Sequence, residues 1–549
     1  MASETDSALR ATAEAWLADD PDPAARAELR ELIDGLPGTA AELGDRFAGP
    51  LTFGTAGLRG RLRAGPNGMN LAVVTRAAAG LITWLAAEGG TGPLVIGYDA
   101  RHGSREFAER TARVATGAGR PALLLPGVLP TPVLAYAVRA LDAVAGVMVT
   151  ASHNPPQDNG YKVYLGRQLG GPAGDGAQIV PPADAGIEAA IRATGPIGGI
   201  PLGDPGTLLD DKIIDGYVGS AAAVLEPGGP RDLTVAYTPM HGVGGGTLIA
   251  AFAAAGFPPP AVVAEQAEPD PEFPTVAFPN PEEPGAMDRL LALAVRTGAD
   301  LAVANDPDAD RCAVAVPAGG GWRALRGDEL GVLLADHLIR RGAPGTYATT
   351  IVSSQLLGRL CAARGVPYAE TLTGFKWIVR AAGELAYGYE EALGYCVAPA
   401  LVRDKDGITA ALTVAELAAG LKAAGRTLGD RLDELAAEFG VHATDQLSVR
   451  VDDLAEIGAA MGRARQRPPA TLLGAPVTAV DDLLPANDVL TFRTAAVRVV
   501  IRPSGTEPKL KAYLEVVEPV TDGDVTAART RAAAALRALR AETADALGV

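Results

Sequence analysis

Cysteines are scarce in this sequence. Cys312, Cys361 and Cys396 are the only three among 549 residues, and their wide spacing matches neither a disulfide framework nor a zinc site. The amino terminus carries Glu4 and Asp6 and lacks the basic segment and apolar core of a secretory signal. We therefore expect a protein of a reducing compartment, the cytoplasm.

Basic runs are also absent, and the formal net charge is −17. Nucleic acids and anionic membranes are bound mainly through clustered Lys and Arg, so neither is an expected partner. Two uncharged stretches are long enough to consider as membrane helices, but residues 121–138 contain four prolines and residues 233–264 contain three consecutive glycines. No membrane span is predicted. A small anionic ligand stays possible where basic side chains converge locally.

What is present is enough hydrophobic sequence for several cores. Hydrophobic residues make up 48% of the chain, and its length predicts three or four domains of about 150 residues. Gly 66 and Pro 42 together form about a fifth of the chain, below the ~25–30% that is typical of low-complexity sequence. We expect these residues to mark turns.

The sequence pattern changes near residue 49. Before it, Ala, Leu and charged residues recur at helical spacing with a break at residues 20–23, which predicts a helical amino-terminal extension. After it, short apolar runs end in Gly, Asp, Ser or Pro and lead into Ala/Leu-rich helical pattern, as at 94–99, 233–242 and 301–307. Strands that alternate with helices predict α/β layers with mostly parallel pairing.

This alternation recurs in three blocks without a strict period. The fold class that we predict is therefore α/β, with three similar α/β domains and a smaller α+β carboxyl-terminal domain. The last block has strand-like runs at 446–451 and 497–501 and a helical pattern from about residue 524. The predicted divisions are 1–48, 49–205, 206–320, 321–440 and 441–549, with Gly/Pro-rich linkers at 194–206 and 314–321.

Three aspartates alternate in the segment A-N-D-P-D-A-D-R, which ends at Arg311. In an extended or looped backbone, Asp306, Asp308 and Asp310 can place their carboxylates on one side. Three hard oxygen ligands suit Mg²⁺, whereas a calcium EF-hand needs Gly and Glu where this chain has Arg311 and Pro317. A solvated acidic turn is the alternative, and the buried-looking strand before the motif disfavours it.

A second segment, V-M-V-T-A-S-H-N-P-P at residues 147–156, is an apolar run that stops at a serine. α/β proteins place their chemistry at the carboxyl ends of strands, yet most serines at such ends only turn the chain. Ser152 is therefore a nucleophile or a turn residue, and this segment alone does not decide between the two.

Two further segments combine hydroxyl, basic and glycine residues. In I-R-P-S-G-T-E-P-K-L-K, Arg502 can grip phosphate oxygens in bidentate fashion. The same segment offers the hydroxyl and backbone N–H donors of Ser504, Gly505 and Thr506. An ordinary Pro/Gly turn is the alternative. In F-G-T-A-G-L-R-G, Arg59 lies between glycines, where backbone can approach a ligand closely.

A third group of candidates surrounds the segment Y-G-Y-E-E-A-L-G-Y. Its adjacent Glu390 and Glu391 can accept hydrogen bonds from vicinal sugar hydroxyls. The flanking segments T-L-T-G-F-K-W and R-D-K-D-G add the candidate ligand-binding residues Thr373, Gly374, Lys376, Arg403 and Lys405. Taken singly, each of these segments is also typical of an exposed turn.

The motifs T-A-S-H-N-P, D-P-D-A-D-R, E-E-A-L-G and R-P-S-G-T-E-P occur in that order within about residues 50–520. With them the chain resembles the α-D-phosphohexomutases, the family of phosphoglucomutases and phosphomannomutases. The segments F-G-T-A-G-L-R-G and T-A-S-H-N-P-P-Q-D-N-G-Y-K are most similar to a subgroup that includes phosphoglucomutases and phosphopentomutases. The resemblance implies four domains around a central active-site cleft, with a last domain that closes over substrate.

The resemblance also implies residue roles. Ser152 looks like a phosphoserine that donates and recovers the phosphoryl group, and with the three aspartates it looks like the ligand set for Mg²⁺. Lys162 occupies the position of a general base or acid, and we expect nearby Mg²⁺ and arginines to favour its uncharged form. Arg59 and Arg311 resemble arginines that face the phosphoserine, and His153 resembles a residue that shapes its surroundings.

The substrate-binding residues that the resemblance implies fall into two loops. Glu390 and Glu391 match the sugar loop, and the turn at 502–506 matches the loop for the phosphate that is not being transferred. The sugar loop of the family commonly has a serine where this chain has Ala392, so the preferred sugar stays open.

The predicted activity is that of a phosphosugar mutase acting through a bisphosphorylated sugar. It interconverts a sugar 1-phosphate with a 6-phosphate or a pentose 5-phosphate, with glucose and mannose phosphates favoured. Mg²⁺ and an activating sugar bisphosphate are the expected cofactors, and a monomer or small homo-oligomer is the expected state. The alternatives are a phosphopentomutase, a phosphotransferase that forms glucose 1,6-bisphosphate, a hydrolase, and a phosphosugar-binding protein without catalysis.

Overall fold

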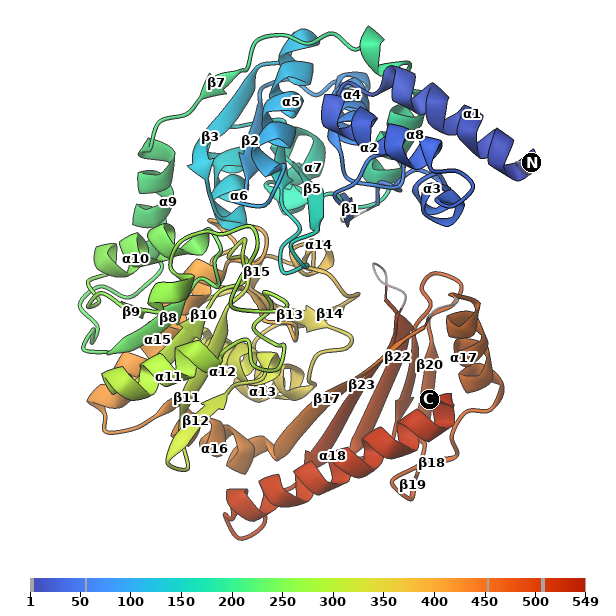
Figure 1. The fold of residues 1–549 in the computed structure, drawn as a ribbon. Coiled ribbons are helices and arrows are strands. Elements are labelled where there is room, and N and C mark those ends of the chain that lie inside the picture. The colour runs from blue at the N-terminus through green and yellow to red at the C-terminus, as the bar shows by residue number, and fades with distance from the viewer. Residues whose placement is uncertain (1–3, 55–56, 452–453, 505–508, 549) are drawn as a thin grey trace.

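The structure is a computed structural model, and it describes residues 4–54, 57–451, 454–504 and 509–548. Three layered α/β units and a carboxyl-terminal unit with an antiparallel sheet follow one another along the chain (Figure 1). This arrangement confirms the predicted fold class.

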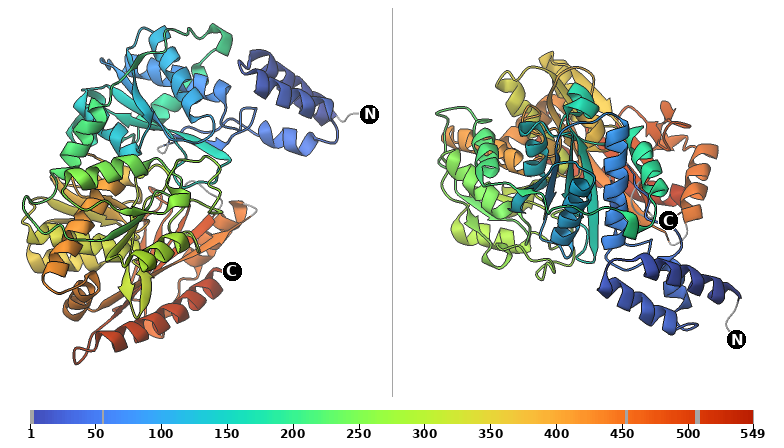
Figure 2. Two further views of the ribbon diagram at one scale, coloured as in Figure 1. Left: turned by 60° about the vertical axis from the view of Figure 1, so that its left-hand side comes forward. Right: turned by 90° about the horizontal axis from the view of Figure 1, so that it is seen from above.

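Three helices precede the first sheet. They are α1 (Glu4–Asp19), α2 (Pro23–Asp34) and α3 (Ala40–Arg46). The chain breaks between α1 and α2 because Asp22 caps α2 by accepting a hydrogen bond from the Ala24 backbone N–H at 2.9 Å, with Pro23 at the first helical position. These helices share a small core of their own and project outward from the first α/β unit (Figure 2).

The first unit is built on a mixed sheet with strand order β1-β5-β4-β2-β3-β7 and with β6 beside β5. Strands β2, β3, β4 and β7 are parallel, whereas β1, β5 and β6 pair antiparallel. The strands are β1 (Leu58–Arg61), β2 (Leu94–Tyr98), β3 (Ala122–Val128), β4 (Ala145–Val149), β5 (Asp158–Leu165), β6 (Ala177–Gln178) and β7 (Thr207–Leu208). The helices are α4 (Leu71–Ala87), α5 (Ser104–Gly117), α6 (Thr131–Ala140), α7 (Arg167–Gly174), α8 (Ala183–Ala193) and the short 3-10 helix η1 (Ile197–Gly199).

The strands of this sheet are continuous apolar runs because both faces are covered. Successive side chains of a strand point to opposite faces. Leu94 and Ile96 belong to the core under α4 and α5, whereas Val95 belongs to the core under α6. With its faces buried, the sheet leaves the carboxyl ends of its parallel strands for polar contacts, and these ends meet the second unit.

The second unit has the strand order β12-β11-β10-β8-β9. Its elements are α9 (Lys212–Ala222), β8 (Val235–Thr238), α10 (Gly244–Ala254), β9 (Ala261–Val262), η2 (Ala264–Gln266), α11 (Asp288–Thr297), β10 (Leu301–Ala304), β11 (Ala313–Ala318) and β12 (Gly321–Ala324). The predicted linker at 314–321 is wrong, because these residues form the β11–β12 hairpin. Gly319 and Gly320 both have positive φ, as a tight hairpin turn requires.

The third unit has the strand order β14-β13-β15-β16, with only β16 antiparallel to its neighbour. Its elements are α12 (Gly327–Arg340), β13 (Thr346–Thr350), α13 (Leu356–Arg364), β14 (Tyr368–Thr371), α14 (Phe375–Ile378), β15 (Leu385–Glu390), β16 (Gly394–Cys396), α15 (Gly407–Ala423) and α16 (Leu428–Phe439). One continuous hydrophobic core joins all three α/β units, with Val95, Tyr237 and Tyr347 among its fully buried members. The predicted domain borders at 205 and 320 stay predictions; β7 and β12 lie just after them.

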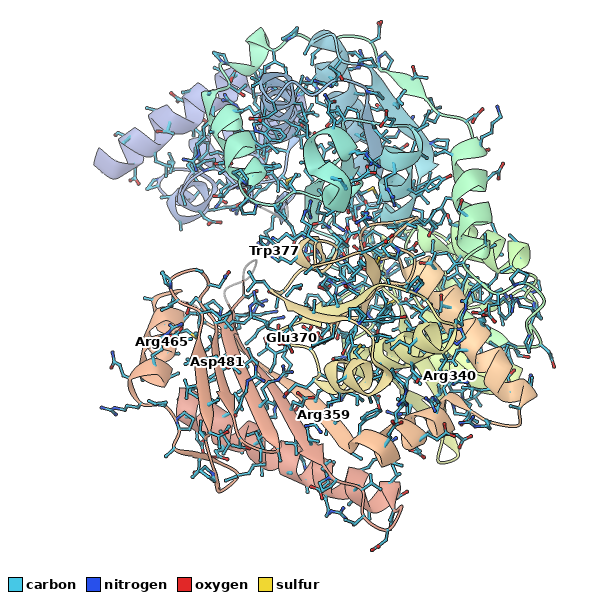
Figure 3. All side chains as sticks on the ribbon, turned by 180° about the vertical axis from the view of Figure 1, so that it is seen from behind. Arg340, Arg359, Glu370, Trp377, Arg465 and Asp481 are labelled. Atoms are coloured by element: carbon cyan, nitrogen blue, oxygen red, sulfur yellow. The ribbon has the colours of Figure 1, made fainter. Side chains whose placement is uncertain are left out.

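The carboxyl-terminal unit carries an antiparallel sheet of order β17-β23-β22-β21-β20 (Figure 3). Its elements are β17 (Val441–Arg450), α17 (Leu454–Gln466), β18 (Thr471–Leu472), β19 (Ala475–Pro476), β20 (Ala479–Asp482), β21 (Leu490–Arg493), β22 (Val497–Pro503), β23 (Lys509–Glu518) and α18 (Val525–Leu547). The predicted strands at 446–451 and 497–501 and the helix from 524 are confirmed in β17, β22 and α18.

Within the described ranges, no single helix is both long and apolar enough to cross a membrane. Helices α15 and α16 meet that criterion only as a pair bent by 90°, and nearly all of α15 is buried in the protein.

Candidate active site

Ser152 lies three residues after the end of β4, in a backbone conformation that few non-glycine residues adopt. Its φ is 52°, in the left-handed region, and its backbone N–H donates to Thr150 Oγ1 at 2.9 Å. The residue is only 3% exposed, so the turn after the strand does not open Ser152 to solvent. Instead its hydroxyl donates to Asp306 Oδ2 at 2.7 Å, across the boundary between the first and second units.

The three alternating aspartates follow β10 and converge as their spacing predicts. Asp306, Asp308 and Asp310 are fully buried, and one carboxylate oxygen from each lies within 4.8 Å of the others. Burial, together with Asp308 and Asp310, raises the pKa of Asp306 well above its ordinary value. Two of the buried oxygens, Asp308 Oδ1 and Asp310 Oδ1, have no hydrogen-bond partner among the residues that the structure describes. A cluster of hard oxygen donors with unpartnered atoms fits Mg²⁺.

Two lysines neutralise part of this acidic cluster. Lys162 Nζ, from β5, donates to Asp308 Oδ2 at 2.7 Å and to Asp310 Oδ2 at 3.1 Å. Lys405 Nζ, from the loop before α15, lies 3.2 Å from the same Asp310 oxygen and 3.6 Å from Asp404 Oδ1. Lys405 is therefore placed at the acidic cluster, although the sequence suggested only a ligand-binding role for it.

In this structure the carboxylates around Lys162 favour its charged form, whereas the sequence argument considered Lys162 beside Mg²⁺ and arginines. Burial alone would lower its pKa, but Asp308 and Asp310 outweigh burial and raise the pKa above its ordinary value. The sequence argument counted the arginines and the metal and left out the two carboxylates that Lys162 contacts directly.

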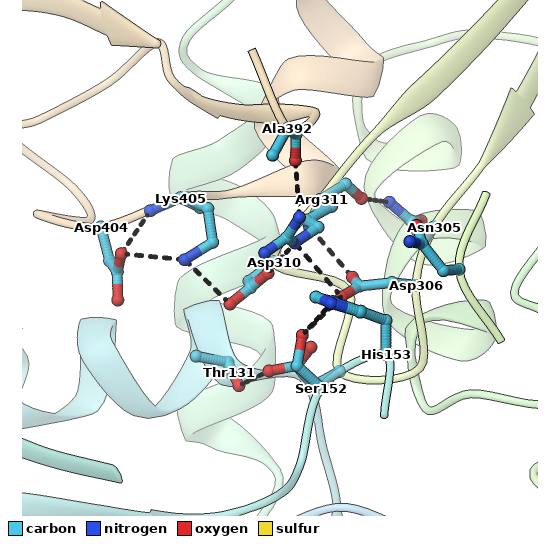
Figure 4. A network of polar contacts seen from close by, with 12 residues as sticks. Thr131, Ser152, His153, Asn305, Asp306, Asp310, Arg311, Ala392, Asp404 and Lys405 are labelled. Atoms are coloured by element: carbon cyan, nitrogen blue, oxygen red, sulfur yellow. Dashed lines mark hydrogen bonds and ion pairs between the residues drawn. The ribbon is translucent and has the colours of Figure 1, made fainter. Parts of the chain in front are cut away.

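His153 and two arginines complete the surroundings of Ser152, and Figure 4 shows His153 and the first of them, Arg311. His153 Nδ1 lies 3.4 Å from Ser152 Oγ and 4.0 Å from Asp306 Oδ2. Burial, with the charges of Arg311 and Arg59, holds the pKa of His153 well below its ordinary value, so the ring is neutral near pH 7. Arg311 Nε lies 3.8 Å from Asp306 Oδ2, and Arg59 donates to Asn154 Oδ1 at 3.1 Å. These contacts place both arginines beside the serine loop.

The sugar loop lies next to Arg311. Arg311 donates to the Ala392 carbonyl at 2.7 Å, and a Cβ on Gly394 would come within 2.4 Å of Lys405 and 3.0 Å of Glu390. Glu390 therefore lies on the same side as Lys405, and its charge helps to raise the pKa of both Lys405 and Arg311. The absence of a side chain at Gly394 gives these two groups their space.

Glu391 points elsewhere. Its Oε2 accepts hydrogen bonds from Ser353 Oγ at 3.0 Å and from Thr350 Oγ1 at 3.3 Å, within the third unit. Burial, with the charges of Glu390 and Asp328, raises the pKa of Glu391 to about 7. The two adjacent glutamates that the sequence grouped together therefore have different surroundings.

The remaining candidates lie on three other loops. Thr373 and Gly374 precede α14, and burial lowers the pKa of Lys376, on α14, to about 8. Arg403 Nη1 is 3.5 Å from the Ala173 carbonyl. In the phosphate loop, Arg502 hydrogen-bonds Tyr513 and the Ser504 N–H donates to the Lys509 carbonyl at 2.7 Å, whereas Gly505 and Thr506 lie outside the described residues.

Three buried residues of the site were missed from the sequence. Thr131 donates its hydroxyl to Asp308 Oδ2 at 2.6 Å and its backbone N–H to the Asp308 carbonyl at 2.9 Å. Asp404 accepts from Tyr164 Oη at 3.0 Å and from Gln178 Nε2 at 2.8 Å, and so joins the third unit to the first. Arg101 donates to the Ser152 carbonyl at 2.6 Å. Thr131 and Arg101 each closely follow an apolar run, which was the available signal.

Comparison with known proteins agrees with this geometry. The family descriptions "Phosphoglucomutase/phosphomannomutase, alpha/beta/alpha domain I", "domain II", "domain III" and "C-terminal domain" match residues 50–196, 215–320, 326–439 and 447–546, in that order.

Two curated relatives and one solved structure show how far the similarity extends. A probable phosphomannomutase of Haemophilus influenzae is 47% identical over 458 residues, which cover 82% of this chain and 93% of the relative. The phosphopentomutase of Mus musculus is 34% identical over 93% of this chain and 90% of the relative. The crystal structure of a Thermus thermophilus protein described as a putative phosphomannomutase superposes with a TM-score of 0.70 at 28% identity, over 89% of this chain and 99% of that one. The chain belongs to the α-D-phosphohexomutase family and is a phosphosugar mutase.

Proposed function

We propose that this mutase interconverts the 1-phosphate and 6-phosphate of a hexose, glucose or mannose, with Ser152 as the residue that carries the phosphoryl group. The observation that supports this proposal most directly is the 2.7 Å contact between Ser152 Oγ and Asp306, within a buried group that also holds Lys162 and the other two aspartates. A strand-end serine with only a turning role has no need of a carboxylate cluster from another unit.

The metal that we propose is Mg²⁺, held by Asp306, Asp308 and Asp310 together with an oxygen of phosphorylated Ser152. When bound, Mg²⁺ neutralises charge on the phosphoryl group that is transferred. Arg311 and Arg59 add positive charge beside the same group, because one lies against the aspartates and the other against Asn154 of the serine loop.

Transfer begins from phosphorylated Ser152. The bond between Oγ and phosphorus breaks while a bond forms between phosphorus and the free hydroxyl oxygen of the sugar phosphate, which yields a sugar bisphosphate. The hydroxyl proton goes to Lys162 Nζ, which can accept it when a bound cation offsets the charges of Asp308 and Asp310 that raise its pKa in this structure. The bisphosphate then turns over in the site, and its other phosphoryl group returns to Ser152, so free sugar bisphosphate acts as activator by phosphorylating the enzyme.

Substrate contacts come from the other loops. Glu390 accepts hydrogen bonds from the sugar hydroxyls, and Glu391 holds the loop through Ser353. The turn that contains Arg502 and Ser504 binds the phosphate that is not being transferred, assisted by the basic candidates of the third unit, Lys376 and Arg403. Ala392 supplies no hydroxyl to the sugar, so we propose that both glucose and mannose are accepted.

A phosphopentomutase is the second candidate, favoured by the 34% identity to the mouse phosphopentomutase over 93% of this chain. The 47% identity to the probable phosphomannomutase favours the hexose. We also propose that the enzyme acts in the cytoplasm as a monomer or small homo-oligomer. All three cysteines are buried and unpaired, as a reducing compartment allows.

The test compares glucose 1-phosphate, mannose 1-phosphate and ribose 1-phosphate as substrates, with Mg²⁺ and glucose 1,6-bisphosphate present. We expect isomerisation of the two hexoses and an intact mass raised by one phosphate that maps to Ser152. Ser152→Ala should abolish turnover, whereas Ser448→Ala, a change at an exposed serine of β17, should leave it unchanged. Phosphate release without isomerisation, or full turnover by Ser152→Ala, would refute the phosphoserine mechanism.

A further inference from the structure

One buried side chain, that of Arg101, binds the backbone of the loop that carries Ser152. Arg101 follows β2 and its side chain is 1% exposed. Its two terminal nitrogens donate to four backbone carbonyls of this loop, those of Ser152 at 2.6 Å, Asn154 at 2.6 Å, Pro155 at 2.8 Å and Asp158 at 3.2 Å. The first three carbonyls belong to the irregular segment between β4 and β5, and Asp158 is the first residue of β5, so one guanidinium joins the two ends of this segment.

Arg101 is itself fixed within the first unit. Asp99 Oδ1 accepts from the Arg101 backbone N–H at 3.0 Å and from Ser104 Oγ at 2.6 Å, while Asp99 Oδ2 lies 3.3 Å from Arg101 Nε. A guanidinium that is held at its Nε edge has its two terminal nitrogens directed at the serine loop. A lysine has one donor atom in place of this fork and cannot reproduce the set.

The face of the guanidinium contacts the second unit. Arg101 Cζ lies 5.0 Å from the centre of the Phe273 ring, a cation–π distance. Phe273 is 3% exposed and has a φ of 47°, a backbone conformation that is uncommon for a non-glycine residue. Its N–H donates to the Asp270 carbonyl at 3.2 Å, and the Asp270 N–H donates to the His241 carbonyl at 3.0 Å.

The contacts continue from His241 to the loop that carries the three aspartates. The Val243 N–H donates to the carbonyl of Pro307, the residue between Asp306 and Asp308, at 2.8 Å. A Cβ on Gly242 would come within 2.4 Å of Pro307 Cα, so only glycine permits this approach. Arg101, Phe273 and the turn at 241–243 also line one small cavity with Pro307.

We propose that Arg101 is a positioning residue that sets the Ser152 loop against the aspartate loop. This inference rests on the proposed role of Ser152 as phosphoryl carrier. In this role Arg101 acts through the Ser152 loop and does not itself bind substrate or metal. Its guanidinium binds the carbonyl of Ser152, whose backbone is left-handed, and the face of the guanidinium packs on Phe273 of the second unit. The 2.7 Å contact between Ser152 Oγ and Asp306 therefore depends on Arg101.

The test uses Arg101→Lys and Phe273→Leu in the full chain. We expect Arg101→Lys to lower kcat at least ~100-fold with KM for glucose 1-phosphate within ~3-fold, because a misplaced reacting group slows transfer while the sugar and distal phosphate bind on other loops. Phe273→Leu should lower kcat ~5-fold in the same pattern. Arg105→Lys is the matched control, because Arg105 is 76% exposed, forms an ion pair with Glu109 one turn along its own helix and should keep full kcat.

Hydrogen exchange separates this inference from the proposed function. Backbone amides of residues 150–158 should exchange at least ~10-fold faster in Arg101→Lys than in the wild type or in Arg105→Lys. If the wild type itself shows no phosphorylation of Ser152, the proposed function fails, and the exchange data still decide whether Arg101 holds the loop. A kcat within ~3-fold of wild type for Arg101→Lys, or unchanged exchange of the loop, would overturn the positioning role. If Arg101→Lys does not fold, Phe273→Leu is the deciding variant: a lower kcat with little change in KM supports the positioning role, and an unchanged kcat overturns it.

Discussion

The first three units and the carboxyl-terminal unit are joined in different ways. The three α/β units share one continuous hydrophobic core. The carboxyl-terminal unit has its own core between its sheet and its helices. Its apolar contacts with the third unit include two small clusters, one of Val352, Val489, Val500 and Tyr513 and one of Ala436, Val441, Ala528 and Ala532. In Figure 3 Glu370, on β14, lies beside the carboxyl-terminal sheet. The proposed phosphoryl-transfer group therefore lies within one rigid body, and the proposed phosphate loop lies on another.

Polar contacts follow the same division. Around the aspartates, Thr131, Ser152 and Lys162 reach from the first unit to the second, and each places a hydrogen bond on a carboxylate of the cluster. The polar contacts that attach the carboxyl-terminal unit to the third unit include one buried carboxylate, Glu515, and Arg498, which donates to the Ile351 and Ser353 carbonyls. Glu515 accepts from Ser354 Oγ at 2.7 Å and pairs with Arg498 Nη2 at 3.1 Å.

This difference indicates that the three α/β units hold their groups in fixed positions, whereas the carboxyl-terminal unit can move. Phosphoryl transfer needs its groups placed within fractions of an ångström, and a shared core supplies that rigidity. A bisphosphate that turns over needs a phosphate loop that can release and regain it. A unit with its own core and a compact polar attachment can rotate as a body.

The largest expected effect comes from the rigid body. Asp308→Asn should lower kcat at least ~1,000-fold, because it removes a carboxylate that Lys162 and Thr131 contact and that we propose as a Mg²⁺ ligand. The attachment of the carboxyl-terminal unit should be unaffected. Steady-state kinetics and calorimetric titration with Mg²⁺ measure the change, and Asp210→Asn, at an exposed aspartate paired with Lys212, is the control. Turnover within ten-fold of the wild type would contradict the proposed metal site.

The next effect comes from the attachment. Glu515→Gln leaves the Arg498 guanidinium, whose side chain is 2% exposed, without its buried carboxylate, a change that costs about 3–5 kcal/mol in typical buried pairs. We expect a separate, earlier unfolding transition in calorimetry, a raised KM and a smaller change in kcat. Glu518→Gln on the same strand is the matched control, because Glu518 pairs with the half-exposed Arg531 and such pairs contribute about 0–1 kcal/mol. A single unshifted transition in Glu515→Gln would contradict the comparison.

Acid should act on the same attachment. Burial alone would raise the pKa of Glu515, but hydrogen bonds from His442 and Ser354 and the charge of Arg498 lower it to about 2. A carboxylate with a lowered pKa in the folded state stabilises that state above its ordinary pKa near 4.5, and this stabilisation is lost as pH falls toward 2. The wild type should therefore lose about 3 kcal/mol from its carboxyl-terminal transition over that interval, whereas Glu515→Gln should not. If the carboxyl-terminal transitions of the two proteins lost the same stability over this pH interval, Glu515 would not be the cause of the loss.

Local patterns predicted much of this molecule. Apolar runs became strands because both faces of each parallel sheet are covered, and the alternating aspartates converged because their spacing of two places them on one side of a loop. Gly319 and Gly320 form a hairpin turn, whereas the sequence suggested a linker at this position. Tight turns and linkers use the same residue types, so composition alone does not distinguish them.

Contacts between distant segments were not predictable from the sequence. Arg101 and Thr131 act on loops more than 50 and 170 residues away, and no local pattern states which loops meet. The contacts of Lys162 were not predictable for the same reason, since two carboxylates of another unit raise its pKa. The site was therefore predictable as a list of motifs, and its positioning residues were not.

The smallest expected effect lies where the two bodies meet. Glu391 accepts from Ser353 Oγ, and the carbonyl of Ser353 accepts a hydrogen bond from Arg498 of the carboxyl-terminal unit. Because burial and neighbouring acids raise the pKa of Glu391 to about 7, its protonated form stabilises the fold below pH 4.5, and this stabilisation is lost as pH rises through 7. Glu391→Gln, a neutral replacement of similar shape, should therefore match the wild-type Tm at pH 5 and exceed it by about 2–4 °C at pH 8. Glu384→Gln, at an exposed loop position, should show no such difference. If the Tm difference between Glu391→Gln and wild type were the same at both pH values, Glu391 would not carry this buried proton, and the link between the sugar loop and the attachment would have to be sought in Ser353 alone.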